Sequence, residues 1–209
     1  AFIMRIFYVC YENLSLQRAP TTHVKEITEH LKKSGNAVIL FAPNTGRLKG
    51  KTDVRVVYVP TLNVRFISEY VYYLSLFFYL LAYHAKFKAD VIYLREMGLS
   101  VAPALIGFIF RIPGILEING IPSVDLKSAG THRLRRKIYW AFQHLNVLLA
   151  DKVICVSENI KRALDSINKN TQKVVIIENG VNKDLFCPQD KIAARRLLSL
   201  EPDCYYLLL

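Results

Sequence analysis

The chain has 209 residues, 52% of them hydrophobic, which is enough for one large domain with a sizeable core and a further fragment. Its formal net charge of +11 favours an anionic partner, and nucleic acid, anionic lipid and phosphorylated sugar substrates all fit that charge. No secretory signal is visible and the 4 cysteines form no C-x-x-C pair. We therefore expect reduced, mostly buried thiols in a cytoplasmic protein rather than disulfides or a metal site.

The first half of the chain predicts three strands and two helices. Thr21 and Thr22 are suitable helix caps, and the helix that follows is expected to run to Lys33, where Gly35 ends it. Apolar runs that end in polar residues or proline predict strands at 4–11, 37–42 and 54–59, and a longer apolar run predicts a helix at 64–87.

The second half continues the same alternation. Strands are predicted at 90–94, 114–118, 152–156 and 173–177, and helices at 100–110, 132–150 and 157–167, with a loop at 121–130. Strands that alternate with helices along a chain predict a doubly wound, Rossmann-like parallel α/β sheet with helices on both of its faces.

The last predicted strand ends at a turn. Residues 174–177 are all β-branched and apolar, as expected for a strand that is covered on both faces. Asn179-Gly180 stops this strand, since glycine can adopt the positive φ of a sharp turn, and we predict a hinge at these two residues. We expect a first domain over 4–181, and over 182–209 a linker with the start of a second domain. A short helix over 191–200 and a buried strand over 205–209 are expected there, and the simplest explanation of that strand is a piece of a longer protein.

The sequence IIENGVNKDLFCP, residues 176–188, resembles the interdomain crossing of family 4 glycosyltransferases with the GT-B fold. In that family an Asn-Gly-Val-Asp-like turn and a Phe-x-Pro close the first domain; here Asn182 stands where the family usually has Asp. The sequence VICVSENIKRAL around Ser157 is similar to the last βα unit of the same domain. The resemblance extends over nearly the whole chain.

The resemblance implies the N-terminal, acceptor-side half of a retaining hexosyltransferase. The whole enzyme would transfer a sugar from a nucleotide-diphosphate sugar to a hydroxyl of a glycan, glycolipid or other glycoconjugate. No metal and no cofactor beyond the donor would be required. The donor would be held mainly by a C-terminal domain that also carries most catalytic residues, so we expect no appreciable transfer by these 209 residues alone.

Ligands of such sheets bind past the carboxyl ends of the strands, so the residues there are candidates for the cleft. Asn13, Thr21 and Thr22 follow the first strand, and free N–H groups at the start of the helix could bind a phosphate. In the family this loop is often Gly-rich and approaches the donor, and His23 matches a residue often seen there. Ordinary helix capping by the two threonines is the alternative.

Five further candidates follow the fourth and fifth strands: Arg95, Glu96, Glu117, Asn119 and Gly120. Glu117 lies in the apolar run GILEING, where a carboxylate needs a partner. A structural ion pair with Arg95 of the adjacent strand is one interpretation, and recognition of sugar hydroxyls by Glu117 and Asn119 is the other. Glu-x-Asn at this place resembles a subgroup of family 4, whereas many other members carry histidine.

Two surface features also need an explanation. The first is a basic patch at the start of a helix, where positive charge opposes the helix dipole. It would fit a phosphate-bearing acceptor or an anionic membrane, and a solvated helix end is the alternative. The second is the segment 70–83, apolar on all sides but shorter than the roughly 20 residues that span a bilayer. A core helix is expected, with a helix that rests one face on a membrane as the alternative. The basic patch consists of Lys127, Arg133, Arg135, Arg136 and Lys137.

The chain lacks a G-x-G-x-x-G fingerprint, a Walker A sequence and a His/Cys metal spacing. The expected partners are a nucleotide-sugar donor and a sugar or lipid-linked acceptor, with a peripheral contact at the inner face of an anionic membrane left open and no nucleic acid. Two alternatives stay open: a non-enzymatic basic α/β module for anionic lipid or nucleic acid, and another GT-B enzyme such as a sugar epimerase.

Overall fold

A computed structural model describes residues 3–46, 48, 52–62, 64, 67–96, 98–120, 133–165, 171–183, 186–201 and 204–206. The chain divides into two compact units, Ala1–Glu178 and Asn179–Leu209.

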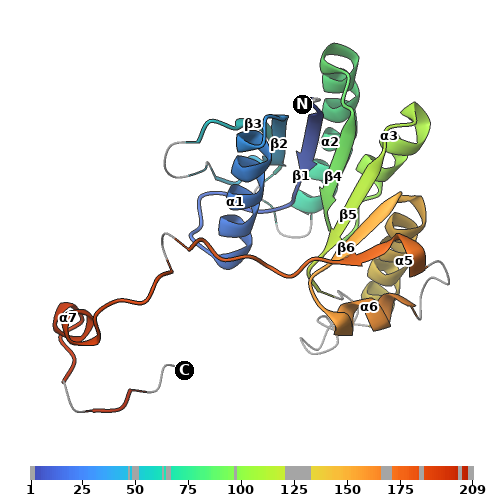
Figure 1. The fold of residues 1–209 in the computed structure, drawn as a ribbon. Coiled ribbons are helices and arrows are strands. Elements are labelled where there is room, and N and C mark those ends of the chain that lie inside the picture. Colours follow the sequence, from blue (N-terminus) through green and yellow to red (C-terminus); the bar gives the residue numbers. More distant parts are fainter. Residues whose placement is uncertain are drawn as a thin grey trace. The chain divides into compact units, whose positions relative to one another are not determined.

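The first unit is built on a parallel sheet of seven strands in the order β3-β2-β1-β4-β5-β6-β7 (Figure 1). The order reverses beside β1, which pairs with both β2 and β4, and the predicted doubly wound α/β class is confirmed. The strands are β1 (Arg5–Val9), β2 (Ala37–Pro43), β3 (Arg55–Val59), β4 (Val91–Arg95), β5 (Gly114–Ile118), β6 (Lys152–Cys155) and β7 (Val174–Ile176).

Helices lie on both faces of this sheet, in unequal numbers. Among the described helices, α1 (Ala19–Lys33) alone covers one face, where its Val24 packs in a small core with Tyr8 and Leu40. The opposite face carries a larger core that includes Phe7, Leu76 and Leu116. The helices of this second layer are α2 (Ile67–Phe87), α3 (Ala102–Phe110), α5 (Arg133–Leu149) and α6 (Glu158–Asp165), followed by the 3₁₀ turn η1 (Thr171–Lys173).

α1 begins earlier than predicted. Its first residue is Ala19, and its N-cap, Arg18, makes no side-chain cap hydrogen bond, so the prediction that Thr21 and Thr22 cap the helix was wrong. The reason is Pro20, which is favoured in a first helical turn because its missing N–H has no partner there anyway. The end at Lys33 and the role of Gly35, which has a φ of 90°, are confirmed.

Two expectations at the end of the first unit were wrong. β7 is an edge strand in which Val175 is 45% exposed, because α1 lies over the other end of this sheet face. Val174 alone of its three residues is buried, so the strand is not covered on both faces. Gly180 does not adopt the positive φ expected of it, so its turn does not require glycine. The hinge at Asn179 and Gly180 stays a prediction.

The second unit contains one short helix among its described residues, α7 (Lys191–Leu197). The carboxylate of Asp190 caps it by accepting from the Ala193 N–H at 2.7 Å, and the helix buries none of its residues. Of the strand predicted over 205–209, Tyr205 and Tyr206 are described and are not in a strand.

α2 is the largest helix of the second layer. Its buried side consists of Tyr72, Tyr73, Leu76 and Leu80, and the Tyr72 hydroxyl donates to the carbonyl of Cys10 at 2.7 Å. The prediction of a core helix is therefore correct for this side. None of the helices in the described part of the chain combines the length and the hydropathy that crossing a bilayer requires.

Leu76→Ala should lower the free energy of unfolding by about 2–5 kcal/mol, because it removes a fully buried side chain and leaves a cavity. Leu74→Ala, in the same helix but 65% exposed, should change it by less than about 0.5 kcal/mol. Urea unfolding of both variants measures the difference. Equal losses would show that the two sides of α2 are not buried as described.

Candidate active site

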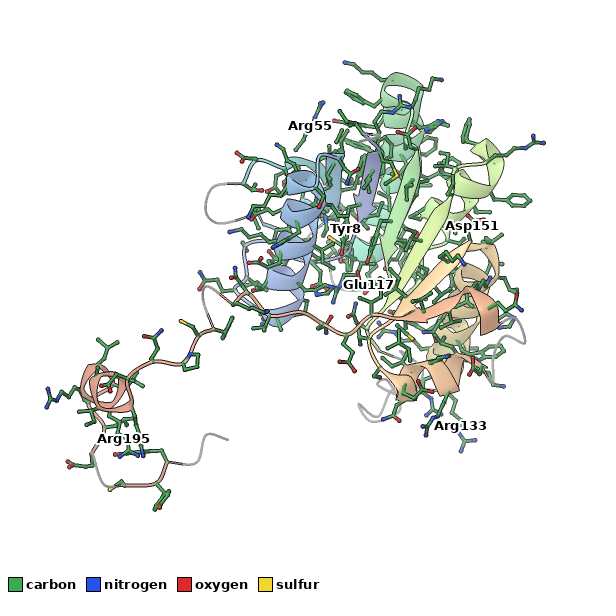
Figure 2. The ribbon with its side chains drawn as sticks, viewed as in Figure 1. Tyr8, Arg55, Glu117, Arg133, Asp151 and Arg195 are labelled. Carbon is green, nitrogen blue, oxygen red and sulfur yellow. The ribbon has the colours of Figure 1, made fainter. Side chains whose placement is uncertain are left out.

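The polar group at the centre of the sheet is the carboxylate of Glu117. It lies in β5, opposite Arg95 of β4, and only 1% of the residue is exposed. Because side chains alternate along a strand, Leu116 and Ile118 point into the larger core while Glu117 points to the other face, toward α1. Figure 2 labels Glu117 together with Tyr8, its neighbour from β1.

Four hydrogen-bond donors surround this carboxylate. The Tyr93 hydroxyl donates to Oε2 at 2.8 Å, and the Tyr8 hydroxyl reaches the same oxygen at 3.4 Å. Oε1 accepts from the Asn119 amide and contacts the His23 ring nitrogen Nε2 at 2.6 Å. Tyr8 and Tyr93 are register partners in β1 and β4, and their rings stack with centroids 4.8 Å apart. The donors thus come from two strands, one helix and one loop.

These contacts decide the charge of Glu117. Burial raises the pKa of the carboxyl, but the hydrogen bonds from His23, Asn119 and Tyr93 outweigh burial and bring the pKa below its ordinary value. Burial, together with the neighbouring Glu117 charge, raises the pKa of the Tyr8 and Tyr93 hydroxyls. Glu117 is therefore ionised at neutral pH, and both tyrosines keep the protons that they donate.

Arg95 lies beside Glu117 as the adjacent strands predict, but its closest partner is another carboxylate. Its Nη1 donates to Glu12, a residue in the loop after β1. Its Nε lies 3.9 Å from Glu117 Oε1 and makes no hydrogen bond to any described residue. The predicted ion pair between Arg95 and Glu117 is thus a longer contact. Glu12 follows the first strand but was not among the predicted cleft residues, and its contact with Arg95 adds it to the candidate site.

The other predicted cleft residues lie after the first, fourth and fifth strands, but the hydrogen bonds described for them hold loops and strands of the protein in place. Asn13 Oδ1 accepts from the backbone N–H and the hydroxyl of Ser15, at 3.0 and 2.7 Å, which closes the loop after β1. The Thr21 hydroxyl donates to the Asn13 carbonyl at 3.4 Å, and Thr22 is exposed. The Glu96 N–H donates to the Glu117 carbonyl at 2.9 Å. Gly120 is half-buried and follows Asn119.

A ligand can reach His23 more easily than Glu117. The His23 side chain is 20% exposed, against 2% for that of Glu117. Tyr8 and Tyr93 are buried, so their hydroxyls hold the Glu117 carboxylate from the side that a ligand cannot reach. Within the described ranges, no cluster of three or more His, Cys, Asp or Glu side chains could hold a metal ion.

The predicted basic patch is partly described, and Lys127 lies outside the described residues. Arg133 and Lys137 are exposed in the first turns of α5, and Arg136 is half-buried. Arg135 donates to the Tyr139 hydroxyl at 3.3 Å, and that hydroxyl donates to Glu69 of α2 at 3.2 Å. Tyr139 therefore joins α5 to α2, and Arg135 donates to its hydroxyl from within α5.

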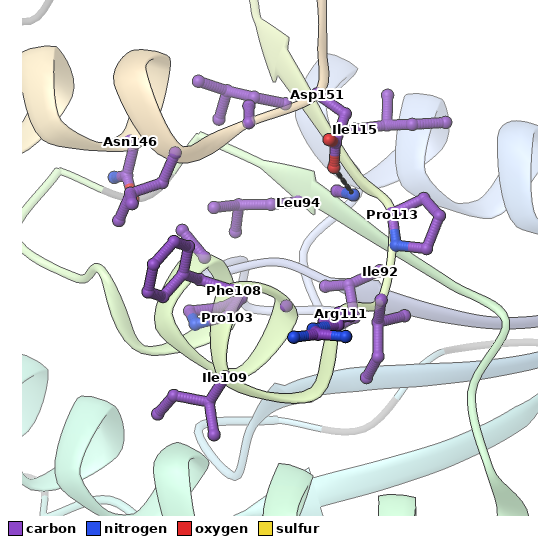
Figure 3. A pocket seen from close by; sticks show the side chains of 17 residues that line it. Ile92, Leu94, Pro103, Phe108, Ile109, Arg111, Pro113, Ile115, Asn146 and Asp151 are labelled. Atoms are coloured by element: carbon purple, nitrogen blue, oxygen red, sulfur yellow. Dashed lines mark hydrogen bonds between the residues drawn. The ribbon is translucent and has the colours of Figure 1, made fainter.

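A pocket of about 660 Å³ lies at the other end of the sheet (Figure 3). Its lining is mainly apolar and comes from α3, β5 and the end of α5, with Phe108 and Ile112 among its side chains. At its rim, Asp151 accepts from the N–H of Gly114, the first residue of β5, at 2.7 Å. Because ligands of such sheets bind past the last residues of the strands, this pocket is not part of the candidate active site.

Comparison with known proteins agrees with the fold described above. The sequence profile of Glycosyltransferase Family 4 matches residues 20–185. An uncharacterized glycosyltransferase of Methanocaldococcus jannaschii is 35% identical over 74 residues, which are 35% of this chain and 18% of that protein.

Several solved structures share the fold, among them the following two. A sucrose-phosphate synthase from Thermosynechococcus elongatus superposes with a TM-score of 0.75 and 17% identity, over 96% of this chain and 53% of that one. Anabaena HepE, solved with UDP and glucose, superposes with a TM-score of 0.65 and 15% sequence identity, over 94% of this chain and 50% of that one. The chain thus spans about half the length of these two structures. The predicted GT-B fold is confirmed, and because the profile covers most of the sequence, this protein belongs to glycosyltransferase family 4.

Proposed function

We propose that this chain is the acceptor-side half of a retaining, metal-independent hexosyltransferase. The enzyme would use a nucleotide-diphosphate sugar as donor and the hydroxyl of a glycan, glycolipid or other glycoconjugate as acceptor. Family membership supports glycosyl transfer, and the complex of Anabaena HepE with UDP and glucose supports a nucleotide-linked donor. Because the chain spans about half of the matched structures, we place the donor site mainly in a second half that is not in this chain.

The observation that carries this proposal is the contact between His23 and Glu117 near the carboxyl ends of the central strands. A carboxylate can only accept hydrogen bonds, so the proton of this contact belongs to His23 Nε2. In the neutral imidazole the other nitrogen, Nδ1, then carries a lone pair. Glu117 therefore fixes the tautomer of His23, as the buried carboxylate does in the Ser-His-Asp arrangement.

This arrangement suits an acceptor hydroxyl. His23 Nδ1 would accept the hydroxyl proton, which orients the oxygen and raises its nucleophilicity as it attacks the anomeric carbon of the donor sugar. The oxygen would approach the anomeric carbon on the face from which the diphosphate departs, since only same-face attack in a single step retains the configuration. The bond from that carbon to the diphosphate would break, and the diphosphate would leave with the bonding electrons. Glu117 is a positioning residue here, since it acts through His23, and Asn119 and Tyr93 hold Glu117 in place.

His23→Ala in the full-length enzyme should lower kcat/KM about 10²–10⁴-fold, the range for removal of a general base. His30→Ala is the matched control, because His30 lies in the same helix, 65% exposed, and contacts the Glu26 carbonyl rather than the site. Steady-state kinetics of both variants with one donor and acceptor pair tests the role. A His23 variant as active as the His30 variant would exclude it.

Glu117→Gln should lower the free energy of unfolding by about 1–3 kcal/mol at pH 7, because it removes the charge to which four groups donate. The folded-state pKa of Glu117 lies below its ordinary value, so its contribution to stability is complete above about pH 4.5 and is lost as the pH falls through the folded value. The difference in the free energy of unfolding between wild type and variant should therefore become smaller at acidic pH. Denaturant unfolding at several pH values measures it, and a constant gap would contradict the ionised state.

The purified full-length enzyme, given a panel of nucleotide sugars, should release nucleoside diphosphate only when an acceptor is present and should retain the anomeric configuration, which NMR of the product reports. The 209-residue chain alone should show no turnover. Conversion of the donor without any acceptor would identify an epimerase instead. Absence of donor turnover combined with salt-sensitive binding to duplex nucleic acid would favour the basic module.

A further inference from the structure

The outer side of α2 is apolar, which is unusual for a helix at the surface of a domain. Ile67, Tyr70, Leu74, Phe78 and Leu81 recur at intervals of three or four residues and form one stripe along the helix. Each is at least 36% exposed, and Leu74 reaches 65%. The opposite side of α2 packs on the sheet, so the helix has two apolar sides and only one of them is buried.

The outer sides of α3 and α5 continue this pattern. In α3, Leu105, Phe108 and Ile109 are exposed, and Phe108 is 70% exposed. In α5, Ile138, Leu145 and Leu148 are exposed at intervals that place them on one side of the helix. α3 packs against both α2 and α5, so the three stripes lie next to one another in a single helical layer. We call them together the apolar face.

The charges on these three helices are almost all positive. α2, α3 and α5 carry five lysines and arginines and a single acidic residue, Glu69, which accepts from the Tyr139 hydroxyl. Arg133 and Lys137 stand exposed at the start of α5, Lys86 at the end of α2, and Arg111 follows α3. The apolar face is therefore bordered by cations at several of its edges.

We propose that the apolar face rests on a lipid bilayer that contains anionic lipids. Contiguous exposed apolar surface marks an interaction site, and apolar side chains bordered by basic ones are the combination that holds a protein at a bilayer surface. Tyr70, an exposed member of the apolar face, is of a type that favours the boundary between headgroups and acyl chains. A second copy fits less well, since it would bring the same cations against one another.

The proposed binding to a bilayer does not rest on the proposed glycosyl transfer at Glu117 and His23. It does unite the two surface features of the sequence, the apolar segment 70–83 and the basic start of α5, on one layer of helices. The pocket of Figure 3 is lined by two of these helices, α3 and the end of α5, and Phe108 and Ile109 of α3 are among its lining residues.

The experiment measures binding of the purified chain to vesicles of phosphatidylcholine alone and to vesicles with about one third phosphatidylglycerol. We expect clear binding to the mixed vesicles, weaker binding as salt is raised, and at least about a tenfold lower partition coefficient for Leu74→Glu/Phe78→Glu. Because both side chains are exposed, the variant should fold, which its thermal melting checks.

Two matched pairs separate the apolar face from general charge effects. Ile192→Glu/Leu197→Glu places the same charges on exposed apolar positions of α7 and should lower the partition coefficient much less. Arg133→Glu/Lys137→Glu should weaken binding to the mixed vesicles more than Lys25→Glu/Lys33→Glu on α1, which covers the opposite face of the sheet.

Failure to bind the mixed vesicles, or equal losses from the α2 and α7 pairs, would overturn the proposal. Self-association that the α2 pair abolishes, without vesicle binding, would instead identify the apolar face as an interface between copies of this chain. Sedimentation velocity of the wild type and of the α2 pair distinguishes that outcome.

Discussion

The arrangement of the first unit depends on keeping one buried charge satisfied. An ionised carboxylate away from water is costly unless donors replace the water that it loses. Glu117 obtains them from β1, α1, β4 and the loop after β5, through Tyr8, His23, Tyr93 and Asn119. These segments must all keep their positions for the charge to stay paired, so the register of the central strands and the placement of α1 are coupled to one carboxylate.

The two faces of the sheet differ in how completely they are covered, and this difference separates the roles of the two layers. The face beneath α1 holds the polar site, with Ile115 and Ile154 half-buried beyond the helix and Val175 exposed on the edge strand. The other face holds the larger core and a continuous helical layer. The candidate site and the apolar face therefore lie on opposite sides of the sheet. Residues of one can be substituted without changing a side chain that contacts the other.

Much of the fold could be predicted from local patterns, whereas the site required the tertiary structure. β5 lies at its predicted residues because an apolar run begins at Gly114 and ends before Asn119. The first turn of α1 was not predicted, because Pro20 determined the start of the helix rather than the two threonines. Adjacent strands predicted that Arg95 and Glu117 are neighbours. The contact of Arg95 with Glu12 depends on the path of a loop, which no periodicity encodes. Likewise, residues 70–83 are apolar on all sides of the helix, so their sequence could not predict which side of α2 is buried.

The four donors around Glu117 set a limit on recognition. A carboxylate offers about four lone-pair directions, two on each oxygen. His23 and Asn119 occupy those of Oε1, and Tyr8 and Tyr93 occupy those of Oε2. The acceptor capacity of Glu117 is thus saturated before any ligand arrives, and a sugar hydroxyl could bond to it only by displacing a protein donor. Any ligand that binds at this site must therefore be recognised mainly by the groups around Glu117, with the carboxylate as the fixed anchor behind them.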